Sequence, residues 1–227
     1  MGDKAIDLRD RPSYSLAEAA RYLKLPAATL RSWVVGRAYS KSGARAGLQP
    51  LIQSVGNPPL LSFYNLIEAH VIRSLQTQHG VAIKELRVAI QFAEETLDIE
   101  RLLLRKDLGT HAGQVLLDEY GNLVNLSASG RLLMRARLTE YLKRIEWDER
   151  RFAVRLYPYV LAPSTASRPI AIDPKIAFGR PIVLKKGIAT EAVTARIDAG
   201  ETIAALAEDY DLEPQEVEEA VIYERAV

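Results

Sequence analysis

The regular pattern of the chain begins with a short amphipathic stretch. Its apolar side chains recur at the spacing of one helix face and are Leu16, Ala19, Ala20 and Leu23. Ser15 and Glu18 have the spacing of a capping box, in which each side chain accepts a backbone N–H at the start of a helix. The pattern predicts a helix over residues 16–24.

A second short helix is predicted after a turn of about three residues. Pro26 suits the opening of a helix and Gly36 its end, which places this helix over residues 27–35. Its inward face would hold Leu30, Trp33 and Val34, and its outward face Thr29, Arg31 and Ser32. Two helices in this relation predict a helix-turn-helix whose second helix is presented outward.

The next segment is basic and is interrupted by glycine and proline. It carries Arg37, Tyr39, Lys41 and Arg45. Turn-forming residues between short β-prone runs are typical of a hairpin. We therefore predict a basic wing with strands near residues 49–54 and 60–63.

The rest of the chain predicts a mainly α-helical protein with small β elements, an α+β fold. Further helices are expected at 64–78, 83–97, 131–145, 190–199, 202–210 and 214–223. Extended segments are expected at 102–105, 114–119, 123–127, 152–161, 170–173 and 181–184, with a linker at 162–168. We expect three domains: a winged helix over 1–97, a middle α+β segment over 98–162 and a helix-turn-helix-like domain of three helices over 163–227.

Charge is distributed unevenly, although the net charge of the 227 residues is only +1. Residues 9–45 hold eight basic and two acidic side chains, whereas residues 189–227 hold two basic and eleven acidic ones. Clustered cations on a helix-turn-helix favour binding to DNA phosphates. The acidic last helix would be repelled by DNA, so we expect a protein contact there, with Val217, Ala220 and Val221 as candidate dimerisation residues.

Several functional classes have no support in the sequence. The chain has no cysteine, which removes disulfides and thiolate metal sites. Its first residues are charged and no apolar run approaches the length of a membrane span, so we expect a cytoplasmic protein without membrane contact. The three histidines have no metal-ligand spacing, and His70 lies on the apolar side of its predicted helix. We expect no enzyme activity, no metal and no cofactor.

The first part of the chain resembles the MerR-type winged-helix family. The motifs that carry the resemblance are Ser15-Leu16-Ala17-Glu18-Ala19-Ala20, Thr29-Leu30-Arg31-Ser32-Trp33, Phe63-Tyr64-Asn65-Leu66 and Gly80-Val81-Ala82-Ile83-Lys84-Glu85-Leu86. The resemblance implies that the second helix enters the major groove and that the wing follows the backbone. It therefore implies DNA contacts by Thr29, Arg31, Ser32, Arg37, Tyr39, Lys41 and Arg45.

The last part resembles the family known as domain of unknown function 433. The motifs are Asp173-Pro174-Lys175-Ile176-Ala177-Phe178-Gly179-Arg180-Pro181-Ile182-Val183, Gly187-Ile188-Ala189-Thr190, Ala199-Gly200-Glu201-Thr202-Ile203 and Leu212-Glu213-Pro214-Gln215-Glu216-Val217. A MerR-like front joined to this module is similar to VapB-type antitoxins, which implies a PIN-type ribonuclease toxin as partner.

A basic stretch between the two parts supplies candidate toxin contacts, because cations can compete for the carboxylates of such a nuclease. They are Arg168, Lys175, Arg180, Lys185 and Lys186. Ordinary loop cations or a second DNA contact remain equal alternatives. We thus expect a homodimeric antitoxin that binds operator DNA and forms a hetero-oligomer with its toxin. The alternatives are a ligand-responsive MerR-like regulator without a toxin, and an adaptor that does not bind DNA.

Overall fold

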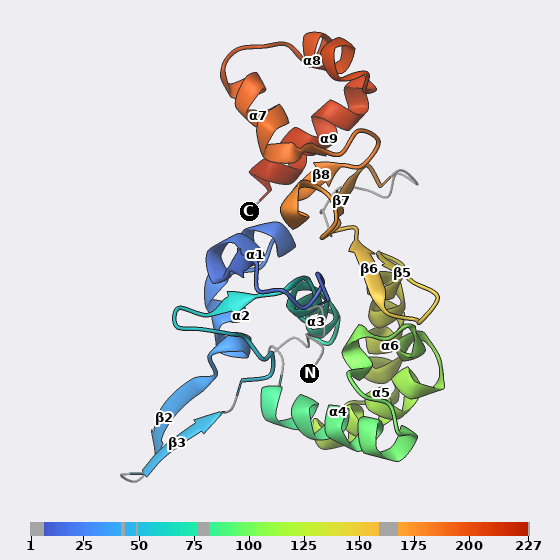
Figure 1. Cartoon of the computed structure of the whole chain (residues 1–227). Helices are drawn as coiled ribbons and strands as arrows, with labels where there is room; N and C mark the ends of the chain where they lie inside the picture. Colours follow the sequence, from blue (N-terminus) through green and yellow to red (C-terminus); the bar gives the residue numbers. More distant parts are fainter. Residues whose placement is uncertain (1–6, 42–43, 49, 77–81, 159–167, 227) are drawn as a thin grey trace, which may run out of the picture.

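The computed structural model describes residues 7–41, 44–48, 50–76, 82–158 and 168–226 (Figure 1). Its α-helices are α1 Leu16–Leu23, α2 Ala27–Val34, α3 Phe63–Ser74, α4 Ile83–Leu97, α5 His111–Leu123, α6 Ala128–Leu142, α7 Thr190–Asp198, α8 Ile203–Tyr210 and α9 Pro214–Arg225. Short 3-10 helices are η1 Leu102–Leu104, η2 Lys106–Gly109 and η3 Ala177–Gly179. The predicted α+β class, dominated by helices, is confirmed.

The strands form three small antiparallel sheets. They are β1 Tyr14–Ser15, β2 Arg37–Lys41, β3 Ala44–Leu48, β4 Leu60–Leu61, β5 Ile145–Trp147, β6 Ala153–Leu156, β7 Ile170–Ile172, β8 Pro181–Val183 and β9 Ile188–Ala189. β1 pairs with β4, and β2 pairs with β3. The third sheet has the order β5-β6-β7-β8-β9, so it joins the middle of the chain to the C-terminal part.

The helix-turn-helix forms where the sequence predicts it. Ser15 Oγ accepts the backbone N–H of Glu18 at 3.2 Å, and Glu18 Oε2 accepts that of Ser15 at 2.9 Å, so the capping box is complete. Lys24 ends α1 with a left-handed φ of 51°, which turns the chain toward α2. Leu30 and Trp33 are buried on the inner side of α2, as their spacing predicts.

The wing lies earlier in the chain than predicted. The hairpin consists of β2 and β3, paired from Arg37 with Leu48 to Lys41 with Ala44. The strand predicted at 60–63 exists as β4, but it pairs with β1 and closes the helix-turn-helix unit, so it is not part of the wing. Residues 50–54 form no strand, and residue 49 lies outside the described part. Figure 1 shows the hairpin extending away from the rest of the molecule.

The middle segment contains helices followed by the strands β5 and β6, and the three strands predicted between residues 102 and 127 were wrong. Residues 102–105 lie largely in η1, residues 114–119 lie within α5, and residues 123–127 comprise the end of α5 and the turn before α6. The helix expected at 131–145 is α6 and begins three residues earlier. The extended segment expected from residue 152 includes β6, and its residues 159–161 lie outside the described part, as does most of the expected linker.

Two hydrophobic cores organise the fold. One runs from Tyr14 through α1–α6 to Leu156 and Ile172, so the expected boundary at residue 97 falls inside a single core. The other contains side chains of β7, β8 and α7–α9. We call residues 168–226 the C-terminal unit. It contains the three predicted helices, which follow the two predicted strands and a third, β9, that was not predicted.

The C-terminal unit packs against the first helix of the chain. The hydroxyl of Tyr223 on α9 donates to the carbonyl of Tyr22 at 2.8 Å, and the hydroxyl of Tyr14 donates to the carbonyl of Gly179 at 3.1 Å. At the edge of this contact Arg21 lies 3.3 Å from Glu224. The C-terminal unit and the helix-turn-helix are therefore in direct contact, as Figure 1 shows.

Candidate functional site

The outer face of α2 has the character of a DNA-reading surface. Arg31 is exposed, and Thr29 and Ser32 are half-buried beside it. The Ser32 hydroxyl donates to the carbonyl of Thr29 at 2.7 Å, which leaves its lone pairs available on the outer side. Ala27 and Ala28 are exposed at the start of the helix, where small side chains allow the backbone to approach a phosphate.

The hairpin β2–β3 carries the other predicted DNA contacts. Arg37, Tyr39 and Lys41 belong to β2, and Arg45 belongs to β3 opposite Ser40. The sequence thus places its cations on the wing as predicted, although the strands were expected later in the chain. Whether these residues touch DNA stays a prediction.

The base of the hairpin is fixed to α2 by backbone hydrogen bonds. The carbonyl of Trp33 accepts the N–H groups of Leu51 at 2.7 Å and of Ile52 at 3.0 Å. Arg87 on α4 donates to the carbonyl of Pro50 at 2.6 Å from the other side. Because the segment after β3 is bonded to both α2 and α4, the position of the hairpin base relative to α2 is fixed.

The cations of the stretch 168–186 divide into two groups. Arg168 donates to the carbonyl of Lys143, Lys185 lies 3.5 Å from Glu216, and Lys186 pairs with Asp211. Lys175 and Arg180 are exposed, and their side chains have no hydrogen bond or ion pair within the described residues. Only the second group therefore presents cations that no hydrogen bond or ion pair holds within the described residues, although the charge of Arg180 also acts on the carboxylate of Glu18.

Two of the three predicted dimerisation residues are not surface residues. Val217 and Ala220 are fully buried in the core of the C-terminal unit, and Val221 is half-buried. The helical spacing that selected them is that of the inner face of α9, which packs on α7 and α8. Val217 and Ala220 therefore hold their own unit together and offer no apolar surface to a second chain, whereas a dimer contact by Val221 stays a prediction.

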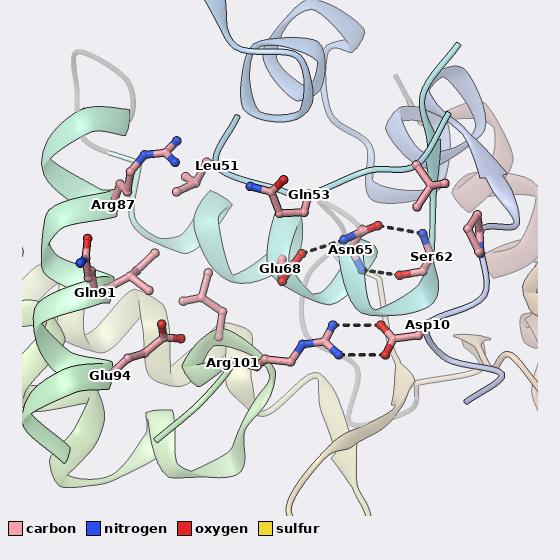
Figure 2. Close-up of a pocket in the computed structure, with 14 residues that line it drawn as sticks. Asp10, Leu51, Gln53, Ser62, Asn65, Glu68, Arg87, Gln91, Glu94 and Arg101 are labelled. Atoms are coloured by element: carbon pink, nitrogen blue, oxygen red, sulfur yellow. Dashed lines mark hydrogen bonds and ion pairs between the residues drawn. The ribbon is translucent and has the colours of Figure 1, made fainter. Parts of the chain in front are cut away.

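A pocket of about 560 Å³ lies between α3, α4 and the segment after the hairpin (Figure 2). Arg101 holds Asp10 with two hydrogen bonds of 2.9 and 3.0 Å, and Asn65 donates to Glu68 at 2.9 Å. Burial raises the pKa of Glu68 to about 7. Glu94 accepts the N–H of Leu102 at 2.8 Å. The charged side chains thus pair with groups of the protein itself and support the fold around the hairpin base.

Sequence reasoning overlooked one exposed side chain. Phe178 is 92% exposed in η3, between Lys175 and Arg180. Nothing in the local sequence distinguishes this ring from a buried one, and only the folded chain shows its exposure. Within the described residues we found no cluster of metal-ligating side chains and no helix long and apolar enough to cross a bilayer.

Comparison with known proteins gives matches at both ends of the chain. Residues 12–90 match a family model described as "Putative DNA-binding HTH domain", and residues 170–223 match "Protein of unknown function (DUF433)". A curated relative from Mycobacterium tuberculosis, named "Putative antitoxin VapB45", is 27% identical, and the match covers 97% of each chain.

One further relative and one solved structure come from the same organism. "Uncharacterized protein Rv2308" is 26% identical, with 94% of this chain and 90% of that protein covered. The crystal structure of Rv2018 has a TM-score of 0.72 at 24% identity and covers 93% of this chain and 98% of its own. The latter likeness shows that the whole arrangement, including the middle segment, is a fold that occurs in a solved protein.

Proposed function

We propose that the chain is an antitoxin that binds its operator DNA through α2 and the hairpin β2–β3, and neutralises a PIN-type ribonuclease toxin by direct contact. The observation that carries the DNA part is the exposed face of α2 next to a projecting hairpin with Arg37, Lys41 and Arg45. The arrangement is similar to the winged helix of MerR-type regulators, in which one helix reads the groove and the wing follows the backbone.

The toxin part rests on the full-length likeness to a protein named as an antitoxin. The acidic α9 fits a role other than DNA contact, because Glu218 is exposed there and a helix rich in carboxylates is repelled by phosphates. DNA contact at one end and protein contact at the other agree with the opposite charges of the two ends.

Co-expression with the protein encoded by the neighbouring reading frame tests the toxin part. We expect a small ribonuclease-like protein to co-purify with the tagged full chain, and its nuclease activity to be absent from the complex. Recovery of the full chain alone, with intact operator binding, would contradict the antitoxin proposal and favour a regulator without a toxin.

A double substitution tests the DNA part. Arg31→Ala with Arg37→Ala should weaken operator binding. It should also make the fall of log K with log salt less steep, by about one unit of slope for each phosphate that is no longer neutralised. Fluorescence anisotropy with operator DNA at several salt concentrations measures both. Arg135→Ala removes an exposed arginine of α6 and serves as the matched control, with unchanged slope expected. An unchanged slope in the double variant would count against this interface.

A further inference from the structure

The most exposed large apolar side chain among the described residues lies in the C-terminal unit. Phe178 is 92% exposed, while the next most exposed, Leu132, is 69% exposed. Exposure of a whole phenyl ring to water is unfavourable, because removing apolar surface from water is favourable. In the part of the chain that the structure describes, no apolar surface covers this ring.

The backbone around this ring is held in an unusual conformation. Ala177, Phe178 and Gly179 have φ values of 47°, 56° and 76°, so three successive residues are left-handed. Side chains other than glycine rarely adopt this region, and such conformations persist only where the surroundings enforce them. Residues held in this way occur preferentially at binding sites.

Both ends of the turn are fixed by buried groups. On one side, the carboxylate of Asp173 accepts Arg155 Nη2 at 2.8 Å and the backbone N–H of Lys175 at 2.9 Å. On the other side, the buried Tyr14 hydroxyl donates to the carbonyl of Gly179 at 3.1 Å. The ring is thus presented on a rigid support, which reduces the entropic cost of binding.

Charge around the ring indicates the chemistry of the partner. Lys175 and Arg180 flank Phe178, are exposed, and have no hydrogen bond or ion pair of their side chains within the described residues. An aromatic anchor between two cations fits an apolar pocket with carboxylates at its rim. A protein surface offers this combination. DNA is a poorer fit, since the hairpin β2–β3 extends away from the C-terminal unit (Figure 1).

We propose that Phe178 is the anchor by which the chain binds its partner protein, inserting into an apolar pocket rimmed by carboxylates, with Lys175 and Arg180 at that rim. The proposal rests on the proposed antitoxin function and goes beyond it by naming the side chain that carries most of the affinity. Phe178 fills the pocket, and the two cations steer the encounter and pair at its edge.

Affinity measurements with the full chain test the anchor. The probe is the purified protein of the neighbouring reading frame, titrated calorimetrically into wild type and into Phe178→Ala. We expect the variant to bind at least about 30-fold more weakly, as hot-spot aromatics do. Lys175→Ala with Arg180→Ala should mainly reduce the association rate and its salt dependence. The melting temperature of Phe178→Ala should equal that of wild type, because the ring is almost fully exposed to water.

Phe92→Ala is the matched control, because Phe92 is a 45% exposed phenylalanine on α4. It should bind like wild type. Equal affinity of Phe178→Ala and wild type overturns the anchor but leaves the antitoxin proposal standing, whereas no binding by wild type overturns both. A Phe178→Ala variant that instead loses operator binding, or loses self-association in sedimentation, also overturns the anchor.

Discussion

Gly179→Ala is expected to lower the free energy of unfolding by about 3 kcal/mol, the combined cost of a left-handed alanine and an overpacked contact. A Cβ at this position would lie 2.0 Å from the hydroxyl oxygen of Tyr14, and the residue has a φ of +76°. Tyr14 is buried and donates to the carbonyl of Gly179, so its ring cannot move without breaking that hydrogen bond. Urea denaturation of the full chain measures the change.

Gly200→Ala is the matched control for this substitution. Gly200 lies in the same unit with a φ of +98°, and a Cβ there meets no atom within 4 Å. This variant carries only the cost of the left-handed conformation, about 1 kcal/mol. Equal decreases in stability in the two variants would show that the contact with Tyr14 does not determine the stability of the docked arrangement.

Stability should fall on acidification through His70. Burial lowers the pKa of this histidine to about 4 in the folded chain, against 6.5 when unfolded, although its Nε2 lies 3.0 Å from the carbonyl oxygen of Tyr141. Between these values the unfolded state binds the proton and the folded state does not. The contribution of His70 to the free energy of unfolding is therefore fully present above pH 6.5. It is lost as the pH falls toward 4, and the total loss is about 3 kcal/mol.

His70→Gln isolates this contribution, since other groups titrate in both proteins. Denaturation at pH 7 and pH 5 should show a smaller decrease of stability in the variant, whose amide can still donate to Tyr141. His111→Gln replaces an exposed histidine and should behave like wild type. A pH dependence in His70→Gln that equals that of wild type would refute the assignment to His70.

The helix-turn-helix and the C-terminal unit could be predicted because their signals are local. Caps such as Ser15 with Glu18 and Thr202, together with regular apolar spacing, act within a few residues and need no distant partner. The hairpin β2–β3 had a weaker signal. Its strands alternate cations with small residues, so hydrophobic alternation favoured the later, apolar segments instead.

The middle segment was misread because its glycines have a packing role. A Cβ on Gly113 would lie 1.9 Å from the carbonyl oxygen of Leu108, and one on Gly121 would lie 3.2 Å from the Cγ of Arg131. Both residues lie inside α5, where they allow neighbouring elements to approach closely. In the sequence, Gly121 looks like the centre of a turn, and nothing local reveals the neighbour that requires it.

The surface around Phe178 could not be predicted from the sequence, because it depends on contacts between distant residues. Lys185 and Lys186 look like free cations, but they pair with acidic residues of α9 and of the turn before it. Nothing near Phe178 in the sequence marks it as exposed, and only the folded chain shows that it is. The residues that present a surface are decided by long-range packing, whereas the residues that form a helix are decided mainly by their neighbours.

The contact between α1 and α9 has a consequence for the order in which the protein is completed. Tyr22 and Tyr223 are 201 positions apart, and at about 5–20 residues per second the ribosome needs roughly 10–40 s to make the chain between them. α1 is therefore made first but acquires its contact with α9 last. The helix that supports α2 therefore reaches its final surroundings only after the C-terminal unit has been synthesised and released, so the helix-turn-helix and the C-terminal unit are completed together.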